Sequence, residues 1–327
     1  MGSNISASAG QTSRKMGCAR RQGRQPLRAV FSQGKVICMI MRKGDIGAYA
    51  EEIFTQPFED TREEQIDAAL RNEKVSHYRV KTIISGPMVE SEIYPVYRRR
   101  GDTPKRPKKK KSDAAQKNLN AKNAKKKFCR LVNANFTKGD ILVTVTYDNE
   151  HRPADEDAAH KSLTKYIRRL QSYAKRRGWP QLKYLYVTEY SESDSPKGRI
   201  RVHHHIICNF PDRDVAENLW KEGGRTNTKR LQLDSDFNLQ GLAMYLVKDP
   251  KGKKRWGGSL NLKKPKVYIA DRKFRSVKQV EQMLNFEGAV YRLGKLYPSF
   301  KLVEEPQVYV NDTYGGYYIY TRLRKKE

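Results

Sequence analysis

The run at residues 201–208, Arg-Val-His-His-His-Ile-Ile-Cys, constrains the fold of this chain more than any other stretch. Valine, isoleucine and cysteine flank three histidines with no glycine or proline between them, which predicts a short buried strand. Because successive strand side chains point to opposite faces, we expect His203 and His205 on one face and His204 on the other. Two imidazoles about 7 Å apart along a strand can share one metal ion. Ordinary hydrogen-bonded strand histidines, or an exposed polar cluster, are the competing interpretation.

The charge of the chain points to an anionic partner. Its 327 residues include 66 Lys and Arg against 36 Asp and Glu, a net charge of +30. Nucleic acid is the commonest partner of so basic a protein. No membrane partner is expected, because no apolar run reaches the length of a spanning helix. The first residues lack secretory character and the four cysteines form no Cys-x-x-Cys pair, so we expect a reduced protein in the cytoplasm.

Composition and periodicity divide the chain into five regions. A capping box at Thr61 and Glu64 predicts a helix, and the turn at residues 85–87 predicts a β-hairpin over 77–97. A basic stretch is followed, from Ser112 on, by residues rich in Ala, Lys, Asn and Gln that predict a helix running to Ala134. The expected regions are a disordered basic N-terminus (1–27), an N-terminal α/β region of unknown role (28–97), a basic linker and helix (98–135), a catalytic domain (136–275) and a C-terminal α/β segment completing it (276–327).

Residues 136–275 have the pattern of a compact α+β domain. Apolar residues predict strands at 141–147 and 182–190, and the second of these is expected to pair antiparallel with the histidine strand. Glu189 projects near the end of that second strand. Between the strands at 141–147 and 182–190, apolar residues at three-and-four spacing predict an amphipathic helix over 159–174 with a basic outer face. A short helix is expected at 214–222.

A later helix carries Tyr245 and Lys248, one turn apart. Ser235 or Asp236 is expected to cap it, and Tyr245 falls at the edge of its apolar stripe. A lysine in this position can lower the cost of forming phenolate, or can hold a phosphate oxygen. The competing interpretation is that Tyr245, one of 19 tyrosines, only packs against its neighbours.

Basic side chains around these elements are candidate DNA contacts. The lysine-rich run with interleaved prolines is either a solvated linker or a phosphate-binding arm, and so basic a chain favours the arm. Positive charge and a tryptophan beyond the tyrosine helix suit a single strand of nucleic acid. The candidate DNA-binding residues are Lys108, Lys109, Lys110, Arg168, Arg169, Arg176, Lys251, Lys253, Lys254, Arg255 and Trp256.

Three of these elements carry a family resemblance. The strand at 141–147, the His203-His204-His205 strand and the sequence Tyr245-Leu246-Val247-Lys248 resemble, in order, the three motifs of rolling-circle replication initiators of the HUH endonuclease superfamily. The flanking residues 117–123 and 256–262 are similar to Rep proteins of bacterial plasmids and phages. The resemblance implies the HUH endonuclease fold, an α+β antiparallel central sheet with flanking helices, to which this chain adds an N-terminal extension.

The resemblance also implies roles. His203 and His205 match the two metal-binding histidines and Glu189 a third ligand, for Mg or Mn. Tyr245 matches the nucleophile and Lys248 the lysine that follows it. Attack on single-stranded origin DNA, for instance in a hairpin, would give a 5′-phosphotyrosine and a free 3′-OH that starts rolling-circle replication. Host helicase and polymerase in a bacterial cytoplasm would be further partners.

Two departures leave alternatives open. His204 stands where the motif usually has a bulky apolar residue, so the ligand pair need not be His203 and His205. No second tyrosine follows Tyr245 on its helix, which implies a single-tyrosine mechanism. A transposase or relaxase that uses the same chemistry, or a non-catalytic nucleic-acid-binding protein, is the alternative to a replication initiator.

Overall fold

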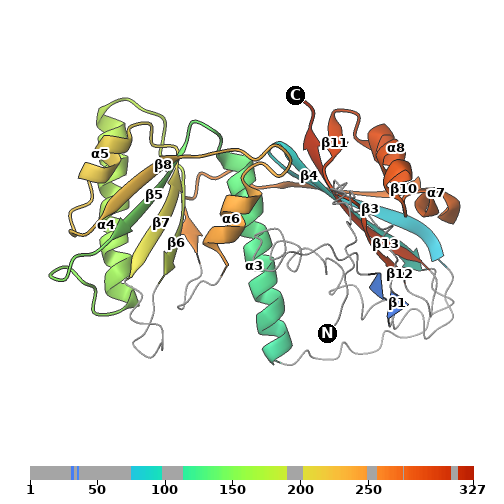
Figure 1. Cartoon of the computed structure of the whole chain (residues 1–327), viewed down its shortest axis with the longest axis horizontal. Coiled ribbons are helices and arrows are strands. Elements are labelled where there is room, and N and C mark those ends of the chain that lie inside the picture. The colour runs from blue at the N-terminus through green and yellow to red at the C-terminus, as the bar shows by residue number, and fades with distance from the viewer. Residues whose placement is uncertain are drawn as a thin grey trace, which may run out of the picture.

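The computed structural model of the chain describes residues 31–32, 35–36, 75–97, 113–189, 202–248, 256–274, 276–310 and 316–327. They form a five-stranded and a six-stranded antiparallel sheet with helices on their faces, and a small pair, β1 (Phe31–Ser32) and β2 (Lys35–Val36) (Figure 1). The predicted α+β class with antiparallel sheets flanked by helices is therefore confirmed. Residues 1–27 and the helix expected after Thr61 lie outside the described residues.

The histidine strand lies at the centre of the five-stranded sheet. The strand order is β8 (Thr226–Arg230), β5 (Ile141–Thr146), β7 (His203–Cys208), β6 (Tyr184–Glu189) and β9 (Gly257–Gly258). The predicted antiparallel pairing of β6 with β7 is confirmed, with Glu189 opposite His203 and Val187 opposite His205.

One face of this sheet is covered by α4 (Glu156–Arg176) and α5 (Arg213–Asn218) (Figure 1). The apolar stripe of α4, which includes Leu163, Tyr166 and Leu170, is fully buried against the sheet. Asp155 accepts a hydrogen bond from the Ala158 amide at 2.7 Å and so caps the helix. The amphipathic helix predicted at 159–174 is therefore present, extended by a few residues at each end.

The opposite face carries α3 (Asp113–Asn135) and α6 (Gln240–Leu246), and α3 stands between the two sheets (Figure 1). Phe128 and Val132 of α3 and Met244 of α6 share one buried cluster with Leu185 and Val187 of β6. Tyr318 and Tyr320 belong to the same cluster, so this core is continuous with the second sheet.

The predicted cap of α6 was wrong. The helix begins at Gln240 after Leu239, and no side chain of the N-cap residue makes a capping hydrogen bond. Asp234 is the residue that organises the preceding turn, because its carboxylate accepts from the amides of Asp236 and Phe237 at 2.8 and 2.7 Å.

The six-stranded sheet joins strands that are far apart in the sequence. Its order is β10 (Lys266–Phe274), β3 (Val75–Ser85), β4 (Met88–Tyr97), β13 (Tyr317–Lys325) and β11 (Phe300–Leu302), and β12 (Gln307–Val310) also pairs with β13. The hairpin predicted around residues 85–87 is confirmed as β3 and β4. Helices α7 (Val277–Glu281) and α8 (Phe286–Leu296) pack on one face. The domain boundaries drawn from the sequence stay predictions.

Within the described part of the chain, no helix combines the length and the apolar character needed to cross a bilayer.

Candidate metal centre and tyrosine helix

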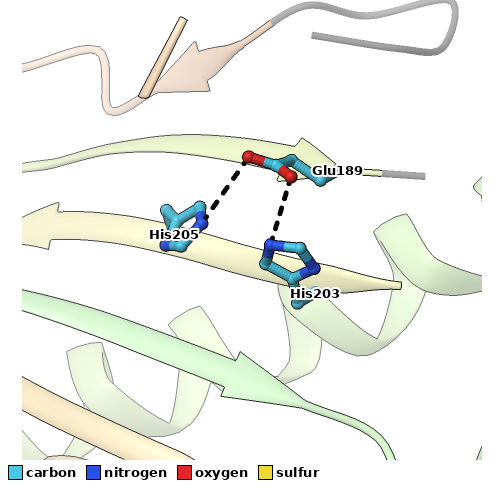
Figure 2. Close-up of side chains that lie close together, drawn as sticks. All are labelled: Glu189, His203 and His205. Carbon is cyan, nitrogen blue, oxygen red and sulfur yellow. Dashed lines mark ion pairs between the residues drawn. The ribbon is translucent and has the colours of Figure 1, made fainter. Parts of the chain in front are cut away.

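Strands β6 and β7 bring three candidate ligands together. The Nε2 atom of His203 lies 3.3 Å from one carboxylate oxygen of Glu189, and Nε2 of His205 lies 3.7 Å from the other (Figure 2). The three ligand atoms lie within 4.8 Å of one another, and no other group of this kind occurs among the described residues. Two imidazole nitrogens and a carboxylate suit a divalent transition metal or Mg²⁺ with open coordination positions. These residues therefore form a candidate metal-binding triad.

The triad is partly open to solvent. The side chains of His205, His203 and Glu189 are 12, 20 and 37% exposed. Burial lowers the pKa of His205 to about 4, the neighbouring His203 adds to this effect, and Glu189 opposes it. At neutral pH His205 is thus the uncharged imidazole that metal binding requires.

His204 points to the opposite face and has a structural role. It is fully buried, with Nε2 at 2.7 Å from the Tyr147 hydroxyl and Nδ1 at 2.8 Å from the Thr188 hydroxyl. Burial lowers the pKa of His204 to about 3, so the ring is neutral. Both ring nitrogens have partners, which explains how a polar residue occupies a position where an apolar one is expected. His204 is not part of the ligand group.

Helix α6 lies over the face that carries the triad. Its buried residues Ala243 and Met244 pack in the cluster that contains Val187 and Ile207, which share a strand face with Glu189 and the two histidines. Tyr245 points away from this core and is 56% exposed. Its side chain is therefore open to solvent, and its role as nucleophile stays a prediction.

Residues 140–250 match the family model described as "Replication-associated protein ORF2/G2P". The match is consistent with a rolling-circle replication initiator and confirms the resemblance drawn from the motifs. We refer to residues 140–250 as the replication-associated region. It contains the triad and Tyr245. No curated protein and no solved structure matches the chain.

Four of the candidate DNA-binding residues lie in the described part of the chain, and they do not form one group. Arg168 and Arg176 are exposed on α4, on the opposite face of the sheet, and Arg169 contacts Glu222 at 3.5 Å. Trp256 packs on Phe128 of α3 with ring centroids 5.5 Å apart. Lys108, Lys109, Lys110, Lys251, Lys253, Lys254 and Arg255 lie outside the described residues. A role in binding DNA stays a prediction for all of them.

Thr144 of β5, within the replication-associated region, is a site residue that the sequence analysis missed. Its hydroxyl lies 3.0 Å from Nδ1 of His205, directly opposite in the strand pairing. When Nδ1–H donates to this hydroxyl, Nε2 carries the lone pair that a metal ion needs. The alternation of β5 could have placed Thr144 on one face, but only the order of the strands shows that His205 is its neighbour.

Proposed function

We propose that this protein nicks and rejoins single-stranded DNA at a replication origin, with Tyr245 as the nucleophile. The proposal rests on one arrangement: the exposed Tyr245 on α6 and the triad of Glu189, His203 and His205 occupy the same face of one sheet, inside the replication-associated region.

The triad would hold the divalent cation, Mg or Mn. Such an ion supplies Lewis-acid polarisation of the scissile phosphate. The Tyr245 oxygen attacks the phosphorus in line and its proton passes to water. The new O–P bond is a 5′-phosphotyrosine, the bond from phosphorus to the 3′-oxygen breaks, and that oxygen takes a proton from water to become the free 3′-OH. Lys248, one turn on, places a positive charge beside the phosphate oxygens.

This reaction suits the start of rolling-circle replication. The free 3′-OH serves as a primer for polymerase, and host helicase opens the duplex ahead in the bacterial cytoplasm. Because the phosphotyrosine link keeps the energy of the phosphodiester, attack by a 3′-OH in the reverse direction rejoins the strand without ATP. The net charge of +30 favours binding of the DNA backbone.

The test is the formation of a covalent adduct between the protein and labelled single-stranded origin DNA in the presence of Mn, resolved by denaturing electrophoresis. Tyr245→Phe should abolish the adduct, and so should a chelator. Tyr291→Phe is the matched control, because Tyr291 is 57% exposed and pairs with Lys295, but lies on α8 outside the replication-associated region.

An adduct that persists in Tyr245→Phe would move the nucleophile elsewhere. Salt-sensitive binding without any adduct, unchanged by chelator, would instead support the non-catalytic binding protein. His205→Ala should weaken Mn binding measured by calorimetry, whereas His151→Ala, a variant of an exposed histidine paired with Asp148, should not.

A further inference from the structure

Helix α6 depends on α3 for both of its ends. At the start, Asn133 Oδ1 accepts hydrogen bonds from the Leu239 amide at 3.1 Å and from the Asn238 side chain at 3.0 Å. At the far end, Lys125 Nζ donates to the Lys248 carbonyl at 2.9 Å. The cap that the α6 sequence lacks is therefore supplied by a residue 106 positions before Leu239 in the chain.

The spacing on α3 matches the length of α6. Eight residues of α-helix separate Lys125 from Asn133, a rise of about 12 Å. The seven residues of α6 span about 10 Å, and the contacted groups lie just beyond each end. Between these contacts the helices pack directly, with Cys129 Sγ 3.2 Å from Met244 Sδ.

Helix α3 is itself fixed to the six-stranded sheet. Arg130 makes two hydrogen bonds to Glu90 of β4, at 2.8 and 2.5 Å, and Tyr320 of β13 donates to the same carboxylate at 3.0 Å. The β3–β4 turn also abuts α3, because a Cβ atom at Gly86 would lie 2.1 Å from the Asn133 carbonyl oxygen.

A helix of seven residues has little stability of its own in water, so its ends must be defined by its surroundings. Tyr245 is largely exposed, and its own packing therefore contributes little to where its hydroxyl lies. We infer that Asn133 is a positioning residue for Tyr245, with Lys125 closing the other end of α6. In this arrangement the six-stranded sheet, through α3, sets the place of Tyr245 on the sheet face that carries the triad. The inference rests on the proposed role of Tyr245.

The test compares single-turnover cleavage of origin DNA at saturating substrate with DNA affinity, for the full chain. Asn133→Leu should lower the cleavage rate about 10- to 100-fold while Kd changes less than about twofold, since small misplacements of reacting groups have effects of this size. Asn133→Asp, which keeps the acceptor oxygen, should cleave at close to the wild-type rate.

Asn135→Leu is the matched control on the same helix. Asn135 makes a similar pair of bonds, accepting from the Lys263 amide at 2.7 Å and donating to the Lys263 carbonyl at 2.9 Å, but it does not hold α6. The cleavage rate of Asn135→Leu should stay near that of the wild type. Equal rates for Asn133→Leu and Asn135→Leu would overturn the inference, because loss of stability alone would then explain both.

Two further measurements keep the test decisive. Hydrogen exchange at the amides of residues 239–247 should accelerate in Asn133→Leu and not in Asn135→Leu, and unchanged exchange would overturn the inference even if the wild type makes no adduct. Absence of the wild-type adduct would count against the proposed function alone. If Asn133→Leu does not fold, Lys125→Met provides the test. Hydrogen exchange at the amides of residues 245–248 should be faster in this variant than in the wild type. An unchanged exchange rate would contradict the inference that α3 holds both ends of α6.

Discussion

The buried ion pair of Glu90 and Arg130 should determine how firmly α3 sits on the six-stranded sheet. The two side chains are only 9 and 20% exposed, and the arginine holds both carboxylate oxygens. A double-mutant cycle with Arg130→Met and Glu90→Leu measures this coupling, because each replacement keeps much of the side-chain volume and removes the charge.

Arg130→Met should reduce the free energy of unfolding by about 3–5 kcal/mol, since Glu90 then stays buried without the guanidinium that binds both of its oxygens, although the Tyr320 hydroxyl and the charge of Lys126 remain. Glu90→Leu should cost about 3 kcal/mol, because Arg130 retains some solvent contact. The double variant buries two apolar groups and should cost only about 1 kcal/mol, from the Tyr320 hydroxyl that loses its acceptor.

Urea unfolding followed by tryptophan fluorescence, on the wild type and the three variants, provides the four free energies. The three expected losses correspond to a coupling energy of about 5–7 kcal/mol. Additive effects, within about 0.5 kcal/mol, would refute the reasoning. Arg79→Met is the control: Arg79 and Asp271 form a comparable two-bond pair, but at 36 and 40% exposure its loss should cost less than about 1 kcal/mol.

Three further outcomes are expected. Burial raises the pKa of Glu90, but the charge and hydrogen bonds of Arg130 and the bond from Tyr320 outweigh it and hold the pKa below the ordinary 4.5. The ion pair therefore contributes its full stabilisation above about pH 5, and this contribution is lost as the pH falls through the pKa of Glu90 in the folded protein. The difference in unfolding free energy between wild type and Arg130→Met should therefore become smaller in acid. A difference that does not change with pH would be evidence against this. Gly86→Ala should destabilise the chain by more than about 1 kcal/mol, because Gly86 has a φ of 62° and its added Cβ would meet the Asn133 carbonyl, whereas Gly139→Ala, with open space around it, should be nearly neutral in thermal melts. Thr144→Val should weaken Mn affinity about 10-fold in calorimetric titration, and unchanged affinity would show that the contact with His205 does not orient the ligand.

Local patterns were sufficient to predict most of the elements around the site. Strand alternation placed His203 and His205 on one face, and the β6–β7 pairing with Glu189 opposite His203 agrees with it. The hairpin of β3 and β4 and the helix α3 were predicted within a few residues of their observed ends. These predictions succeeded because the period of a strand or helix, and the residues that begin and end it, are written within a few neighbouring positions.

The start of α6 is a feature that local sequence patterns did not predict. Ser235 and Asp236 are good capping residues, but Asp234 binds the turn before the helix, and the Leu239 amide finds its acceptor on Asn133. A cap contributed from a distant helix leaves no signal near the residues that it caps.

The sequence by itself therefore determined the three residues of the triad, the strand face that His203 and His205 share and the resemblance to replication initiators. Only the tertiary structure decided that β5 lies beside β7, so that Thr144 contacts His205, and that His204 belongs to the opposite core. It also decided that strands from both ends of the chain form the sheet on which α3 rests. The physical reason is that side-chain direction follows from local backbone period, whereas the choice among strand neighbours and distant hydrogen-bond partners depends on the free energy of the whole packed core.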